Sequence, residues 1–113
     1  MRRDAVLLAE IVNGVKRILE LTAGLSAVEI EIAPDRRDSL LWNFTVLGEA
    51  VSQLSAGLKA EHPGMDANRI RNRIVHGYWS VDFEVLIATA RGDLPSFLVA
   101  VETVLASLVE DAE

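Results

Sequence analysis

Hydrophobic residues recur at helical spacing along most of the chain. In residues 4–21 the apolar positions step by four, four and three, which places them on one face of an amphipathic helix. Residues 35–58 carry a second stripe with alternating steps of four and three, the spacing typical of a seam between packed helices. The two stripes consist of Leu7, Ile11, Val15 and Ile18, followed by Leu40, Phe44, Leu47, Val51, Leu54 and Leu58.

The segments between these stripes predict where helices begin and end. Gly24 is placed to end the first helix. The alternating segment SAVEIEIAP is interpreted as a connector that packs Val28 and Ile30 onto the helices, because a lone short strand has no partner. Asp35 is a candidate cap of the second helix, and the segment EHPGMD interrupts the chain after it.

The segment after EHPGMD predicts a third, short helix. Asp66 is placed to cap it, and it is expected to end near His76. Gly77 follows, in a position at which helices often terminate.

The C-terminal part predicts two further helical segments. Ser80 or Asp82 can cap a fourth helix over about residues 82–91. The segment RGDLP interrupts it, and Pro95 is tolerated in the first turn of a fifth helix. The alternative is a single helix kinked at Pro95. The apolar face of the last segment consists of Phe97, Leu98, Val101, Leu105 and Leu108.

These elements predict an all-α fold, an up-and-down bundle of four or five helices in a single domain over residues 1–113. The chain contains no cysteine, which excludes disulfides and thiolate metal sites. The N-terminal segment meets charged residues too soon for a signal peptide, and no apolar run approaches the roughly 20 residues that span a membrane. We therefore expect a cytoplasmic protein with no membrane partner.

The formal net charge of −6 argues against a broad nucleic-acid-binding surface but permits a local one. Residues 67–79 contain three arginines, Arg69, Arg71 and Arg73, and no acid, a local charge of +3. The rest of the chain therefore sums to −9, from −6 minus +3. The molecule is predicted to be polarised, with one basic spot.

The basic segment also contains groups suited to chemistry at a phosphodiester. His76 can give or take a proton near neutral pH, and Arg71 can bind phosphate oxygens through its fork of donors. In RNA the 2′-hydroxyl can attack the neighbouring phosphorus when a base removes its proton and a cation stabilises the growing charge. That route needs no metal, and the two histidines, 14 residues apart without an acid cluster, predict no metal site.

The spacing of Arg71 and His76 leaves two arrangements open. Five residues correspond to roughly 140° around a helix axis, so the two side chains do not converge within one regular helix. Either the helix ends near His76, or a second chain completes the site. A single histidine also cannot act as separate acid and base, and a two-fold dimer supplies two histidines. We favour the dimer.

Several of these residues also have ordinary structural explanations. Arginines on a helix usually form a solvated face, and a histidine before a glycine often interacts with the C-terminal helix dipole. Trp42 is expected in the core and His62 on the surface. Gly48 inside a strong helix indicates either close helix packing or a role for Glu49 at the site or at a dimer interface.

The segment RNRIVHGYW resembles the signature of the HepT-like proteins of the HEPN superfamily, which is an arginine, four residues, a histidine, one residue and a tyrosine. Arg71, His76 and Tyr78 supply these positions here. The segments RRDAVLLAEIVNGVKRILELTAGLS, LLWNFTVLGEAVSQLS and RGDLPSFLVAVETVL resemble the first, second and C-terminal helices of that family. The resemblance implies a HEPN bundle that forms a two-fold dimer with the motif in a cleft between the subunits.

The same resemblance implies a function. HepT-like proteins act as metal-independent ribonuclease toxins of type II toxin–antitoxin systems, and the antitoxin is a minimal nucleotidyltransferase of the MntA kind. Carried over, Arg71 and His76 are catalytic, Asn72 is supporting, and Tyr78 is the residue to which the antitoxin transfers AMP. Arg69 and Arg73 are candidate RNA contacts, and no cofactor is expected. The alternative is a non-catalytic helical adaptor that binds a nucleotidyltransferase.

Overall fold

The structure is a computed structural model that describes residues 2–80 and 82–112, with the side chains of residues 3–77, 79–80 and 82–110. Every regular element in this part is helical, which confirms the predicted all-α class. In chain order the elements are α1 (Arg2–Thr22), α2 (Ala27–Glu31), α3 (Pro34–Gln53), α4 (Ala56–Glu61), the 3₁₀ turn η1 (Pro63–Met65), α5 (Ala67–Trp79), α6 (Phe83–Ala88), the π-helical turn η2 (Thr89–Asp93) and α7 (Leu94–Ala112).

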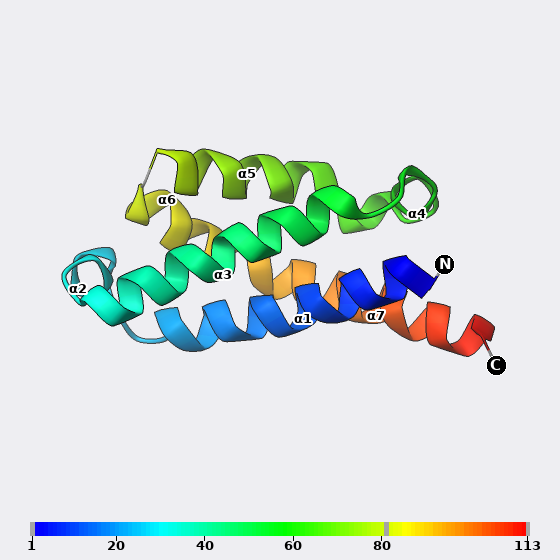
Figure 1. The fold of residues 1–113 in the computed structure, drawn as a ribbon, viewed down its shortest axis with the longest axis horizontal. Coiled ribbons are helices and arrows are strands. Elements are labelled where there is room, and N and C mark those ends of the chain that lie inside the picture. The colour runs from blue at the N-terminus through cyan, green and yellow to red at the C-terminus, as the bar shows by residue number, and fades with distance from the viewer. Residues whose placement is uncertain (1, 81, 113) are drawn as a thin grey trace.

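The long helices α1, α3, α5 and α7 run alternately up and down along an elongated bundle (Figure 1). Helix α1 lies against α3 and α7, and α3 lies against α5. The short helices α2 and α4 lie at opposite ends of the bundle (Figure 1). The up-and-down arrangement predicted from the sequence is therefore the one observed.

The two predicted apolar stripes form the centre of the core. In α1 the four stripe residues are 7% exposed or less, and in α3 the first four are at most 1% exposed. The second stripe does not belong to one helix, however. Helix α3 ends at Gln53, and Leu58 lies in the separate helix α4, where it is fully buried.

The corner between α3 and α4 is held by a buried carboxylate from α1. Asp4 is 4% exposed; its Oδ1 accepts from the backbone N–H of Ser55 over 2.9 Å, and its Oδ2 accepts from the Ser55 hydroxyl over 2.7 Å. The Ser55 hydroxyl in turn accepts from the N–H of Leu58 and caps α4. A buried carboxylate needs such partners to offset its desolvation, and here they join the N-terminus of α1 to this corner.

The predicted connector after α1 is instead a short helix, α2. Ser26 and Glu29 form a capping box, which favours a helical turn over an extended chain. The hydrogen bonds from the backbone and side chain of Ser26 lower the pKa of Glu29 below its ordinary 4.5. Ile30 is buried as expected, but Val28 is 63% exposed, because residues two apart in a helix point to different sides.

Asp35 does not cap α3. The helix begins at Pro34, and the cap position is occupied by Ala33, which has no side-chain cap hydrogen bond. Proline is preorganised for the first helical position because its φ is fixed and its missing N–H has no helical partner there. Asp35 lies in the first turn, where the helix dipole favours a negative charge.

Helix α6 begins where the sequence predicts. Asp82 caps it by accepting from the N–H groups of Glu84 and Val85. The helical path then continues without a break through η2 into α7. The predicted alternative, a single helix kinked at Pro95, therefore describes the structure better than two separate helices. The irregularity is a π-helical turn before Pro95, which accommodates a residue that lacks an N–H and would clash inside a regular α-helix.

By length and composition alone, the 28-residue stretch Phe83–Glu110 is apolar enough to cross a membrane. In this respect the structure differs from the expectation that no apolar run approaches that length. The core helices of water-soluble bundles meet the same criterion. Here Leu94, Phe97 and Val101 of this stretch are buried in the common core.

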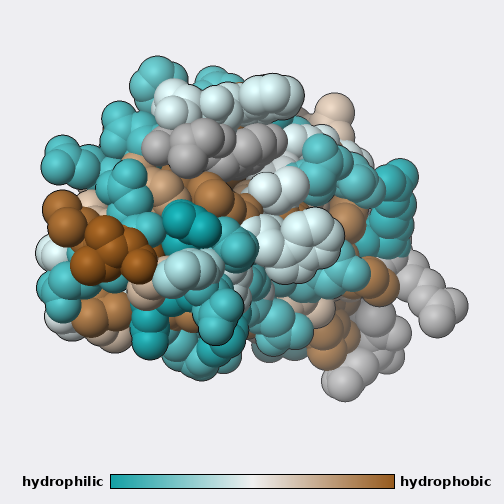
Figure 2. Space-filling model, turned by 60° about the vertical axis from the view of Figure 1, so that its left-hand side comes forward, coloured by the Kyte–Doolittle hydropathy of each residue, from teal (hydrophilic) through white to brown (hydrophobic). Residues whose placement is uncertain are grey.

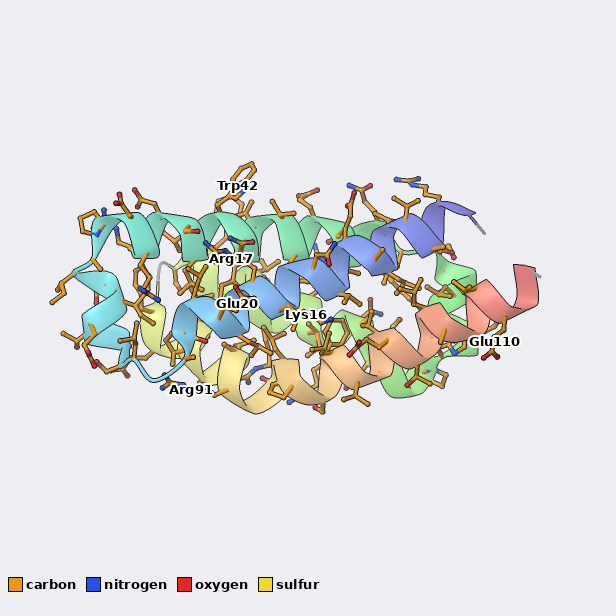
Figure 3. All side chains as sticks on the ribbon, turned by 90° about the horizontal axis from the view of Figure 1, so that it is seen from below. Lys16, Arg17, Glu20, Trp42, Arg91 and Glu110 are labelled. Carbon is orange, nitrogen blue, oxygen red and sulfur yellow. The ribbon has the colours of Figure 1, made fainter. Side chains whose placement is uncertain are left out.

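The C-terminus of α1 is capped by two arginines from distant elements. Arg36 on α3 donates to the carbonyl oxygen of Leu21 over 2.9 Å. Arg91 on η2 donates to the carbonyl oxygens of Thr22 and Leu25, and Figure 3 shows it below this end of the helix. Cations at these positions bond the orphan carbonyls and complement the helix dipole. Gly24, with φ of +72°, then turns the chain away, as predicted.

Some hydrophobic side chains lie at the surface. Trp42 is 68% exposed and points away from α3 (Figure 3), so the expectation that it is a core residue is wrong. It lies between the buried positions of the stripe and therefore on another side of the helix. Ile32, just after α2, is 73% exposed, and Figure 2, which brings this end of the molecule forward, shows hydrophobic surface among hydrophilic residues.

Candidate functional site

Helix α5 carries the basic motif and is anchored by its apolar face. Ile70 and Ile74 are at most 2% exposed and lie four residues apart on the side that faces the core. Arg71, Asn72 and His76 occupy other sides of the helix and are all exposed. This segment thus forms an amphipathic helix whose polar side chains face solvent.

Gly77 is an interior residue of α5, so the prediction that it ends the helix is wrong. The helix continues to Trp79. A Cβ atom on Gly77 would lie 2.5 Å from Cδ2 of Leu86, which shows that α6 packs directly on the glycine. The glycine is required for this close approach and not for a turn. His76 lies in the last turn of α5.

Arg69 and Arg73 are paired with one acid and are not free cations. Nη2 of Arg69 lies 2.9 Å from Oδ1 of Asp93, and Nε of Arg73 lies 2.8 Å from Oδ2 of the same carboxylate. The second contact is an ion pair without the geometry of a hydrogen bond. Asp93, on η2, has a side chain only 11% exposed. These two candidate RNA contacts therefore tie α5 to η2, and part of their charge is offset.

Arg71 differs from its two neighbours in its partners. Its Nε donates to the hydroxyl of Ser52 on α3 over 3.0 Å, and its Nη1 makes a long contact of 3.5 Å with Oδ1 of Asn72. Both partners are neutral, and no acid forms an ion pair with Arg71 within the part of the chain that the structure describes. Within that part, Arg71 is held by neutral groups and not by an acid.

The imidazole of His76 is exposed and makes no hydrogen bond or ion pair to the described residues. The backbone carbonyl of His76 accepts from the hydroxyl of Ser80 over 2.6 Å, which closes the end of α5. An imidazole without fixed partners can use either nitrogen for proton transfer. Because α5 is a regular helix here, His76 and Arg71 remain roughly 140° apart around its axis.

The remaining motif residues lie close by in the chain. Asn72 is one helical turn before His76 on the same face, and it is exposed. Tyr78 belongs to α5, but its side chain lies outside the described part. Glu49 is exposed on α3, between the buried residues Gly48 and Ala50. The burial of Gly48 agrees with the close packing expected of a glycine inside a strong helix.

Two residues at this site were not found by sequence reasoning. Ser52 contacts Arg71 from 19 positions away, and Asp93 contacts Arg69 from 24 positions away. Neither spacing follows a helical period, and serine and aspartate are common surface residues. The acid in RGDLP was visible in the sequence, but its pairing depends on how η2 packs beside α5.

No group of three or more His, Asp or Glu side chains that could hold a metal ion occurs among the residues the structure describes. Together, the geometry defines a helical-bundle protein with an exposed arginine and an exposed histidine on one surface helix, both without acidic partners in that part. The comparisons with known proteins assign this class to a family. The chain belongs to the HepT-like ribonuclease family, since the family described as "Ribonuclease HepT-like" matches residues 11–104.

A relative from Thermococcus cleftensis (strain DSM 27260 / KACC 17922 / CL1), named "Probable ribonuclease HepT", is 25% identical to the chain over 92 residues. The match covers 79% of this chain and 84% of the relative. No solved structure matches the chain significantly. The resemblance found in the motif and the helices is therefore confirmed at the level of the family.

Proposed function

We propose that the chain is a ribonuclease that cleaves RNA by attack of the 2′-hydroxyl on the neighbouring phosphorus, with Arg71 and His76 as its catalytic residues. The observation that carries this proposal is the difference among the three arginines of α5. Arg69 and Arg73 are paired with Asp93, while Arg71 has neutral partners within the described part and shares α5 with the exposed His76. Membership of a ribonuclease family supports the same assignment.

The chemistry assigns a separate role to each group. Neutral His76 removes the proton of the 2′-hydroxyl, whose oxygen attacks phosphorus and forms a 2′,3′-cyclic phosphate as the bond to the 5′-oxygen breaks. A second, protonated imidazole gives its proton to the departing 5′-oxygen. Arg71 donates to the non-bridging oxygens, on which negative charge accumulates in the transition state. The route balances without a metal ion.

A two-fold dimer is the assembly that fits these requirements. Of the two arrangements left open by the spacing, we favour completion of the site by a second chain, because the helical path of α5 continues past both Arg71 and His76 to Trp79. The second chain supplies a second His76 as the acid and places an Arg71 from one chain within reach of a His76 from the other.

The experiment that tests the role of Arg71 compares two arginines. We expect Arg71→Ala to lower RNA cleavage by about a hundredfold or more, since a preorganised cation at the transition state has effects of that size. Arg17→Ala is the matched control, because Arg17 is an exposed helical arginine in a surface ion pair with Glu20. Equal activity of the two variants would contradict the assignment.

We further propose that the ribonuclease is a cytoplasmic toxin controlled by a minimal nucleotidyltransferase antitoxin. The antitoxin would join the Tyr78 oxygen to the α-phosphorus of ATP and release pyrophosphate. AMP at this position adds bulk and negative charge two residues from His76, where the phosphate of RNA has to lie. This proposal rests on the position of Tyr78 in the HepT-like motif.

The second candidate function is a non-catalytic adaptor for a nucleotidyltransferase. The acidic net charge of −6 and the partial offset of Arg69 and Arg73 by Asp93 favour it, because RNA affinity rises with the number of phosphates neutralised. Expression of the chain with and without a neighbouring nucleotidyltransferase gene separates the two functions. A toxin arrests growth and is relieved by the neighbour, whereas an adaptor does not arrest growth.

A further inference from the structure

The hydroxyl of Ser52 contacts Arg71 across the interface between α3 and α5. Nε of Arg71 donates to Oγ of Ser52 over 3.0 Å. The same Oγ donates to the carbonyl oxygen of Gly48, one turn earlier in α3, over 2.7 Å. Arg71 is thereby connected through Ser52 to the backbone of a buried segment of α3.

The polarity of these two hydrogen bonds is fixed. A serine hydroxyl has one proton and two lone pairs. The bond to Gly48 uses the proton, so a lone pair remains for the Nε–H of Arg71. The guanidinium is then held through its Nε–H, which leaves its Nη groups available to other acceptors. Within the described part, Nη1 makes only the long contact with Asn72.

The pairing of Asp93 with two other arginines of α5 shows the effect of a charged partner. It holds Arg69 and Arg73 and offsets part of their charge. Ser52 holds Arg71 with a neutral oxygen and leaves its charge intact. A neutral acceptor holds the arginine without bringing an acid that would compete with a phosphate.

We propose that Ser52 is a positioning residue that orients Arg71 toward the scissile phosphate of RNA. This inference rests on the proposed ribonuclease function and adds a residue to it. Ser52 touches no reacting atom; it acts through Arg71, by reducing the number of orientations that the guanidinium adopts before the substrate arrives.

Three substitutions separate positioning from a purely structural role. Ser52→Ala removes the acceptor, Ser52→Thr keeps it, and Ser52→Asp replaces it with a charged one. Thr103→Ala is the matched control, because Thr103 is an exposed helical hydroxyl that donates to the carbonyl of Val99 in the same way. In the described part, no arginine or lysine donates a hydrogen bond to the Thr103 hydroxyl.

The experiment measures kcat and KM for cleavage of a single-stranded RNA in EDTA, together with the melting temperature of each variant. We expect Ser52→Ala to lower kcat about tenfold with a smaller change in KM, as for an interaction that matters mainly in the transition state. Thr is expected to restore kcat, and Thr103→Ala to leave it unchanged. Asp is expected to lower kcat further while the melting temperature stays the same or rises.

The outcomes distinguish this inference from the proposed function. Full kcat in Ser52→Ala, with an active wild type, would overturn the positioning role of Ser52 alone. A kcat lost only in proportion to a lowered melting temperature would also overturn it, because that is the result of a structural role. Absence of cleavage by the wild type would overturn the ribonuclease proposal and this inference with it.

Discussion

The carboxylate of Asp93 lies 2.8 Å from the guanidinium of Arg73, across the contact between η2 and α5. The same carboxylate contacts Arg69, one turn earlier in α5. Two of the three arginines in the basic segment thus hold the bundle together. Asp93 offsets one of their two positive charges, whereas Arg71 has no acidic partner in the described part.

Asp93→Asn tests this structural role. We expect it to lower the free energy of unfolding by about 1–2 kcal/mol, because two partly exposed arginines lose a nearly buried partner. Chemical denaturation measures the change. The control is Asp38→Asn, in which the exposed pair with Arg37 is lost and the change is expected to stay within about 0.5 kcal/mol. Equal effects would contradict a special role for Asp93.

Gly77→Ala tests the close approach of α6 to α5. The added methyl group would meet Leu86 at 2.5 Å, and we expect a loss of about 1–3 kcal/mol of stability from overpacking. Gly14→Ala is the control, since nothing lies within 4 Å of a Cβ there and alanine favours α1 by about 0.5–1 kcal/mol. Thermal melts of both variants are expected to shift in opposite directions. A neutral Gly77→Ala would mean that the glycine is not needed for packing.

Asp4→Ala tests the hydrogen bonds at the corner of α3 and α4. The backbone N–H and the hydroxyl of Ser55 lose their acceptor, and we expect a loss of about 1–3 kcal/mol of stability. In this variant the rate of hydrogen exchange is expected to rise more at the amides of α4 than at those of α1. Unchanged protection of α4 would show that Ser55 caps this helix without Asp4.

The dimer has its own test. We expect a mass in solution of about 25 kDa, twice the 12.4 kDa of the chain, by light scattering. The specific activity of RNA cleavage is expected to fall when the protein is diluted below its dimer dissociation constant. Full activity at concentrations where the mass is that of one chain would rule out a site shared between subunits.

The sequence predicted the parts of this molecule that depend on local periodicity. The stripe from Leu40 to Val51 predicted α3, and Asp82 marked the start of α6. The prediction for Gly77 was wrong because a glycine can mark either the end of a helix or a close contact between helices. Only the packing of Leu86 against Gly77 distinguishes these two roles.

The candidate site was predictable only in part for a related reason. The motif residues of α5 could be chosen by type and by resemblance to a family. Ser52 and Asp93 could not, because their contacts depend on how α3 and η2 pack against α5. The same holds for Trp42, whose exposure is decided by which side of α3 the other helices cover.

The decisive test of the ribonuclease proposal is RNA cleavage by the purified chain in EDTA, with the wild type beside His76→Ala and the intact mass of each recorded. We expect cleavage by the unmodified wild type and none by His76→Ala, with equal melting temperatures because His76 is exposed. A wild type that carries AMP on Tyr78 is predicted to be inactive until the AMP is removed. Equal cleavage by the two proteins, or none by an unmodified, dimeric wild type, would contradict the account.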